Sequence, residues 1–346
     1  MYLLYLFFLT ANERALVNTL TPARSSSDSF AEKERKARTE QGQFCRDLDA
    51  GIIQAPLSGD GKLEHLKSKL ATLQLGFPGK NVHFKMEVYD NNDIVSLSIL
   101  GGNGWDNDKI NQILGVIVNY ADQHKVPLSD LTFVDIGANV GWFTFVMASL
   151  GLNVVSFEPL NQNLYLLRKT LCHPANTHIR DRVLLFGHGL SYEKQTCIQA
   201  SGTINVGDGV MLCVQDPSTY VPPQGFEVRG SVAVDRIDDV LSTSDRHIVA
   251  VKMDTEGYEA HVVLGGPKFF LGSKIPYIFS EFVPSGMMAA AGGDGVRFVR
   301  NFLDAGYLLS EEGSTQYHNR KYALNLLNFP GVHELFFEYK PELATQ

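Results

Sequence analysis

The sequence lacks any concentrated stretch of positive charge. Its 30 lysines and arginines are outnumbered by 38 aspartates and glutamates, which gives a formal net charge of -8. Binding to nucleic acid or to an anionic membrane requires clustered Lys and Arg that neutralise phosphate. We therefore expect no nucleic acid partner and no anionic membrane as the main binding partner.

The chain also has few cysteines, at positions 45, 172, 197 and 213. They form no C-x-x-C pair and no Cys/His spacing typical of a zinc site. The sequence therefore predicts no metal and no dense disulfide framework, and it favours reduced, partly buried thiols. If the chain is secreted, Cys197 and Cys213 are the pair to test.

No long hydrophobic run is present that could span a membrane. The apolar start, MYLLYLFFLTA, meets charge at Glu13 and Arg14, before the roughly 20 apolar residues that a spanning helix needs. A signal peptide fits this length better, but a basic start is missing and Leu9 with Ala11 make a poor cleavage pair. We expect a cytoplasmic protein, with the secretory pathway as the alternative.

Three regions are expected along the chain. Residues 1–80 form an N-terminal extension, partly disordered or helical, because the segment from Thr21 to Arg46 is too polar to fold alone. Residues 81–128 contain a predicted β-hairpin, with two strands between Phe84 and Leu100 around Asp90-Asn91-Asn92-Asp93, and then a helix from about Asn107. Residues 129–346 form the main domain.

The most informative segment of that domain is VDIGANVGWF, from Val134 to Phe143. An apolar run ends at Asp135 and passes into glycines four residues apart, which predicts a strand, a tight turn and a helix. Gly137 can adopt backbone angles that a Cβ forbids, and Gly141 allows the start of the helix to approach a ligand closely. The alternative is that both glycines only shape the turn.

A second strand, LNVVSFEP, ends at Glu158. An acid at the end of the second strand of a doubly wound sheet can accept both hydroxyls of a ribose. The G-x-G-x-x-G pattern of dinucleotide sites is missing, which argues against a nicotinamide-dependent oxidoreductase. The pattern suits S-adenosylmethionine, a nucleoside cofactor without phosphate.

Further acids follow two later strands. The strand from Ile248 to Met253 ends before Asp254, and a helix is predicted to begin with Glu256 and Glu259 in its first turn. The strand YIFSEF ends near Glu281. These carboxylates are expected at the same edge of the sheet as Gly137 and Glu158.

Four blocks of sequence resemble the FkbM-type methyltransferases, a family of S-adenosylmethionine-dependent enzymes. They are VDIGANVGWFT, VSFEPLNQNLYLLRKTL, VAVDRIDDVL and VAVKMDTEGYEAHVVLGG, and with the strand that ends in Glu281 they span about residues 133–307. The resemblance implies an α/β, Rossmann-like methyltransferase fold. In this fold a mostly parallel seven-stranded sheet has helices on both faces and a C-terminal antiparallel strand.

The resemblance also implies roles for single residues. Glu158 would hold the ribose, and His188 would lie in the turn after the third strand, on the adenine side. The residues that would shape the pocket around the methionine end of the cofactor are Asp135, Gly137, Asn139 and Gly141.

The expected chemistry is in-line methyl transfer to a hydroxyl, for which a general base is needed. Asp254 and Glu256 are the first candidates, and His188, His261 and Glu281 are also available. As an alternative, Asp254 caps the next helix and Glu256 stabilises its dipole. The acceptor is expected to be a sugar, a lipid-linked molecule or a small natural product, with the segments 199–230 and 284–295 as lids. A catalytically silent binding module remains the alternative function.

Overall fold

The computed structural model describes residues 27–53, 66–77, 80–90, 93–213, 220–222, 224–284, 295–311, 316–326 and 331–344. The apolar start of the chain and most of the expected lid at 284–295 lie outside these ranges. Among the helices that are described, none is both long and apolar enough to cross a membrane.

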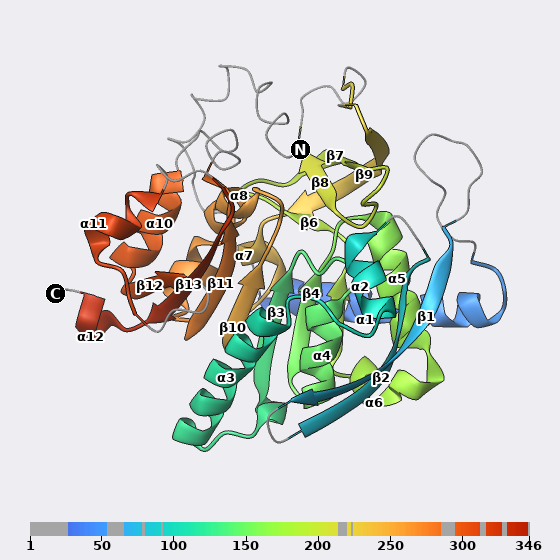
Figure 1. Cartoon of the computed structure of the whole chain (residues 1–346), viewed down its shortest axis with the longest axis horizontal. Coiled ribbons are helices and arrows are strands. Elements are labelled where there is room, and N and C mark those ends of the chain that lie inside the picture. Colours follow the sequence, from blue (N-terminus) through green and yellow to red (C-terminus); the bar gives the residue numbers. More distant parts are fainter. Residues whose placement is uncertain are drawn as a thin grey trace.

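A seven-stranded sheet forms the centre of the molecule (Figure 1), in the order β12-β13-β11-β10-β3-β4-β5. Strands β3, β4, β5, β10 and β11 are mutually parallel, and β13 runs antiparallel to both β11 and β12. The strands are β3 (Leu131–Ile136), β4 (Asn153–Phe157), β5 (Val183–Phe186), β10 (His247–Met253), β11 (Tyr277–Phe282), β12 (Tyr307–Glu311) and β13 (His333–Tyr339). This arrangement confirms the predicted fold class.

Helices cover both faces of this sheet, which is why every residue of β3 is buried. Successive β3 residues enter opposite cores: Phe133 packs on one face and Val134 on the other. The first face carries α3 (Asn107–His124), α4 (Trp142–Leu150) and α5 (Asn161–Cys172). The second carries α7 (Ile237–Val240), α8 (Glu259–Leu264) and α10 (Gly295–Asp304). The short helices are α6 (Thr177–Arg180), α11 (Arg320–Ala323) and α12 (Pro341–Ala344).

The polar N-terminal segment forms a 23-residue helix, α1 (Ser27–Asp49). It packs beside β5, α5 and α7, and Ala37 enters the second core. Residues 27–49 of the expected N-terminal extension are therefore helical, and this helix is attached to the domain.

The predicted hairpin lies earlier in the chain than expected. It consists of β1 (Ser68–Phe77) and β2 (Lys80–Tyr89), and the predicted second strand is a helix, α2 (Ile94–Leu100). Asp93 caps this helix by accepting a hydrogen bond from Ser96 N at 2.7 Å. Asp93 thus begins a helix instead of closing a hairpin turn, because its carboxylate satisfies the N-terminus of that helix.

The prediction of reduced thiols was wrong. The structure has two disulfides, Cys45–Cys172 between α1 and α5 and Cys197–Cys213. The second follows from strand register, because Ile198 pairs with Leu212 and the adjacent positions face each other. The first joins residues 127 apart in sequence, a proximity that no local pattern reveals.

The Gly/Pro-rich segment after β5 forms a small four-stranded sheet in the order β6-β9-β7-β8. Its strands are β6 (Gly189–Leu190), β7 (Gln195–Gly202), β8 (Gly209–Leu212) and β9 (Phe226–Asp235). Figure 1 shows this sheet in yellow, beyond the carboxyl ends of the central strands. The sequence analysis expected a lid over residues 199–230, and the structure places β8 and parts of β7 and β9 there.

Candidate functional site

The register of the central strands places several of the expected site residues side by side at the carboxyl edge of the sheet. Ile136 pairs with both Phe157 and Met253, and Met253 pairs with Ser280. The next residues are therefore adjacent at the carboxyl edge of the sheet: Gly137, Glu158, Asp254 and Glu281.

The two glycines of the turn after β3 have different environments. Gly137 has φ +79°, and a Cβ there would meet the carbonyl oxygen of Asp254 at 1.8 Å. Gly141 has φ +95°, and its Cβ would meet Leu167 and Phe145. Gly137 thus allows two strand ends to approach each other, whereas Gly141 allows close packing of α4 on α5.

One cavity opens at this edge, beneath the small sheet. It brings together six of the predicted site residues: Gly137, Asn139, Glu158, His188, Asp254 and Glu256. Asp135 and Gly141 do not belong to its wall. The other lining residues include Phe157, Asn163, Gly207, Asp208, Met211 and Thr255.

Asp135 lies below the cavity and is fully buried. Its carboxylate accepts a hydrogen bond from Thr144 Oγ1 at 2.6 Å and pairs with Lys252 Nζ at 3.7 Å. Lys252 also pairs with Asp254 at 3.4 Å and donates to the Gly137 carbonyl at 2.8 Å. The buried Lys252 is thus paired with two neighbouring acids, and the group supports the glycine turn from beneath.

Glu158 lies on the cavity wall and is held by backbone amides. Its Oε2 accepts from Asn139 N at 2.7 Å and its Oε1 from Leu160 N at 2.8 Å. Burial raises the pKa of this carboxyl to about 7, although these hydrogen bonds oppose the shift. Since a carboxylate oxygen has two lone pairs, Oε2 retains acceptor capacity for a ligand.

Aromatic rings border the cavity next to Glu158. Phe157 stacks on Phe186 with ring centroids 5.0 Å apart, and the His188 ring contacts both. Burial lowers the pKa of His188, so its ring is neutral at pH 7. A neutral, flat and mostly apolar surface therefore adjoins a carboxylate.

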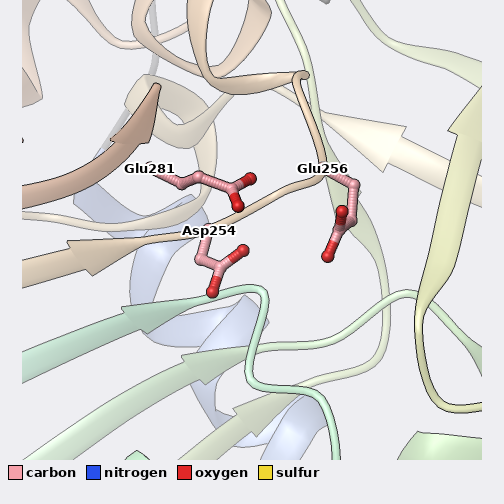
Figure 2. A group of neighbouring side chains, drawn as sticks. All are labelled: Asp254, Glu256 and Glu281. Atoms are coloured by element: carbon pink, nitrogen blue, oxygen red, sulfur yellow. The ribbon is translucent and has the colours of Figure 1, made fainter. Parts of the chain in front are cut away.

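Three carboxylates lie close together near the carboxyl ends of β10 and β11 (Figure 2). Asp254, Glu256 and Glu281 each offer an oxygen within 4.8 Å of the others. Burial and the neighbouring acids Asp254 and Glu259 raise the pKa of Glu281 to about 10. Acidic clusters are common without a bound ion, and nothing else among the described residues indicates a cation. We therefore assign no metal to these carboxylates.

The position of Glu256 differs from the prediction. Helix α8 begins at Glu259, and Glu256 lies in the preceding loop with φ +57°. Glu259 occupies the first turn and accepts hydrogen bonds from Thr255 N and Thr255 Oγ1. Glu256 therefore does not act on a helix dipole from within a first turn, and its side chain lines the cavity instead.

His261 lies away from the cavity. Its ring stacks on Tyr258 and Tyr192, with centroids 4.0 and 5.2 Å away. Burial lowers its pKa to about 3. The His261 ring is therefore packed between aromatic side chains of the fold.

Sequence reasoning missed Asp208 and Asn163. Asp208 stands between two glycines in NVGDG, a pattern that is typical of a turn. Asn163 donates through Nδ2 to the Gly207 carbonyl at 2.8 Å and to Glu158 Oε1 at 3.4 Å. Only the tertiary structure brings both residues to the cavity.

Comparison with known proteins identifies the family. Residues 135–309 match the methyltransferase FkbM domain. Among curated proteins, no match was found.

The solved structures that resemble the chain include the following three. An FkbM methyltransferase from Methylobacillus flagellatus KT has 18% identity and a TM-score of 0.37, over 66% of this chain and 55% of that one. A precorrin-6y C5,15-methyltransferase from Geobacter metallireducens GS-15 has 12% identity and a TM-score of 0.30, over 61% and 80%. WbdD has 12% identity and a TM-score of 0.38, over 68% and 40%. This chain therefore covers about half of the length of the Methylobacillus flagellatus KT structure.

The family match covers the glycine turn, Glu158 and the acidic edge in one segment of the sequence, in keeping with the α/β sheet described above. The chain belongs to the FkbM methyltransferase family.

Proposed function

We propose that this protein is an S-adenosylmethionine-dependent methyltransferase that methylates a hydroxyl of a sugar, a lipid-linked molecule or a small natural product. One observation carries the proposal: a single cavity combines the Glu158 carboxylate, the ring of His188 and the carboxylates of Asp254 and Glu256. These groups suit a nucleoside at one end and a proton-accepting site at the other.

The residues present fit this cofactor. Glu158 has acceptor capacity for ribose hydroxyls, and Phe157, His188 and Met211 offer apolar surface for a purine. Asn139, with φ +53°, turns the backbone so that its amide fixes Glu158. S-adenosylmethionine, when bound, supplies a methyl group that its sulfonium already activates.

The residues of the chain would then orient the acceptor and receive its proton. Asp254 Oδ2 lies 3.4 Å from Lys252 Nζ, and Glu256 lies two residues away on the same loop. Either carboxylate can serve as the general base within the cavity. Proximity and orientation of the two reactants would supply most of the rate acceleration, because the donor is already activated.

An uncharged acceptor agrees with the charge of the cavity. No Lys or Arg occurs among the described residues that line it, whereas four acids do: Glu158, Asp208, Asp254 and Glu256. Such a wall repels phosphate, which disfavours a nucleic acid acceptor and supports a glycan or small hydroxyl compound.

The disulfides support an oxidising compartment. Structural disulfides persist in secreted and lumenal proteins and are rare in the cytosol. Because all four cysteines are paired, we favour the secretory pathway over the cytoplasm.

Calorimetric titration with S-adenosylhomocysteine and, separately, with NAD tests the proposed cofactor. We expect micromolar binding of the first, none of the second, and weaker but measurable binding of the first in Glu158→Gln. Asp181→Asn, at an exposed position on the surface, is the matched control and should bind normally. A folded wild-type protein that binds neither ligand would favour the binding-module alternative.

A further inference from the structure

Two carboxyl groups from distant parts of the chain meet on the cavity wall. Asp208 lies in the loop between β7 and β8, and Glu256 lies in the loop after β10. Their side chains share a hydrogen bond. Ionised carboxylates only accept hydrogen bonds, so a hydrogen-bonded pair of this kind holds one proton between its two members.

Asp208 is held in place by a polar clamp on the neighbouring residue, Gly207. Gly207 N donates to Asp93 Oδ1 at 3.0 Å, and its carbonyl accepts from Asn163 Nδ2 at 2.8 Å. A Cβ at Gly207 would meet Asp93 Oδ1 at 2.5 Å and Asn139 Oδ1 at 3.0 Å. Asn205 Nδ2 also donates to Asp208 Oδ2 at 3.0 Å. The loop is therefore built to present Asp208 at this position.

Acidic groups outnumber basic groups around the pair. The titratable side chains near Asp208, Glu256 and their acidic neighbours are Asp93, Asp254, Glu281, Glu259, Glu334, Lys252 and Lys109. Lys252 pairs with Asp135 and Asp254, and Lys109 pairs with Asp106 and Glu334.

Both nearby lysines are thus paired with other acids. Burial, the hydrogen bond to Asp208 and the charges of the other acids raise the pKa of Glu256 well above its usual value. The hydrogen bond and the raised pKa of Glu256 both favour retention of the shared proton as long as no further positive charge enters the cavity.

We propose that the Asp208–Glu256 pair is a charge-sensing subsite that exchanges its shared proton for the positive charge of the methyl donor. This inference rests on the proposed function. S-adenosylmethionine carries one more positive charge than S-adenosylhomocysteine, which is its neutral thioether product. Entry of the sulfonium would release the proton to solvent, so that one positive charge replaces another and both carboxyls become ionised.

This exchange has two consequences for the reaction cycle. It favours the charged donor over the neutral product in the same cavity. It also leaves Glu256 ionised only when the donor is bound, so that Glu256 can accept the proton of the acceptor hydroxyl at that stage. Product formation then leaves the pair with one proton again, as at the start.

The number of protons exchanged on binding tests the proposal without any methyl acceptor. Calorimetric titrations at pH 7 are run in buffers of different ionisation enthalpy, once with S-adenosylmethionine and once with S-adenosylhomocysteine. We expect the charged ligand to release about one more proton than the neutral one. Glu256→Gln and Asp208→Asn should remove this difference and lower the affinity ratio of donor to product by on the order of tenfold. Asp181→Asn should change neither.

The outcomes separate the two proposals. If both ligands bind the wild-type protein with equal proton release, the charge-sensing subsite is disproved and the methyltransferase proposal stands. If neither ligand binds the folded protein, both proposals fail. If folded Glu256→Gln and Asp208→Asn both keep the wild-type difference in proton release, the proton comes from another acid such as Glu281, and the charge-sensing subsite is likewise disproved.

Discussion

At the scale of single residues, Glu256 is the position where backbone strain coincides with a proposed function. It has φ +57° on the cavity wall, a conformation that costs a residue with a Cβ roughly 1–2 kcal/mol relative to glycine. Strain of this kind is retained where a side chain is needed. A glutamate at this strained position, one residue before Gly257, supports the proposed role of its carboxyl group.

This strain gives a prediction of opposite effects on stability and binding. Glu256→Gly should raise the free energy of unfolding by about 0.5–1 kcal/mol, since relief of the strained φ exceeds the entropy that glycine adds to the unfolded chain. The same variant should bind S-adenosylmethionine more weakly relative to S-adenosylhomocysteine. Lys125→Gly, at φ +56° on the exposed end of α3, is the control that should gain stability alone. A stability loss in Glu256→Gly would show that its side chain is structural.

A second residue-scale prediction concerns Glu158 and pH. Its pKa of about 7 means that the carboxyl is increasingly protonated below neutral pH and loses one acceptor site. The affinity for S-adenosylhomocysteine should therefore fall as pH decreases through 7, by up to about tenfold per unit. Calorimetry from pH 5.5 to 8.5 measures this dependence, and Glu158→Gln should abolish it. An identical pH profile in both proteins would argue that Glu158 does not contact the ligand.

At the scale of elements, the attachment of α1 is the feature that sequence reasoning could not supply. The helix is anchored by Cys45–Cys172, by an ion pair between Arg246 and Glu34, and by Gln41 Nε2, which donates to the Arg168 carbonyl at 3.1 Å. These contacts depend on residues more than a hundred positions away, whereas the helical propensity of the segment is local.

The disulfide of α1 yields an element-scale prediction. Removing it in a Cys45→Ser/Cys172→Ser double variant should cost about 2–5 kcal/mol, because the bond closes a long loop in the unfolded chain. Hydrogen exchange should rise in residues 27–49 more than in the central strands. The Cys197→Ser/Cys213→Ser double variant is the matched control and should leave exchange in α1 unchanged. Free thiols in protein purified without reductant would contradict the pairing.

At the scale of the whole molecule, the parallel sheet and much of its site could be predicted from local patterns. The glycine turn, the acids at strand ends and the buried Lys252 are readable because strand ends of a parallel sheet meet at one edge. The helix at 94–100 was mistaken for a strand because seven residues of mixed apolar character fit either period. Asp208 was missed because its place depends on the clamp formed by Asp93 and Asn163 around Gly207.

The central claim is that the cavity between the glycine turn and the small sheet holds the methyl donor. A crystal structure of the chain with S-adenosylhomocysteine tests it most directly. We predict electron density for the ribose against Glu158, for the purine against Phe157 and His188, and for the thioether sulfur on the side of Glu256. Ligand density at another place, with this cavity empty, would contradict the account.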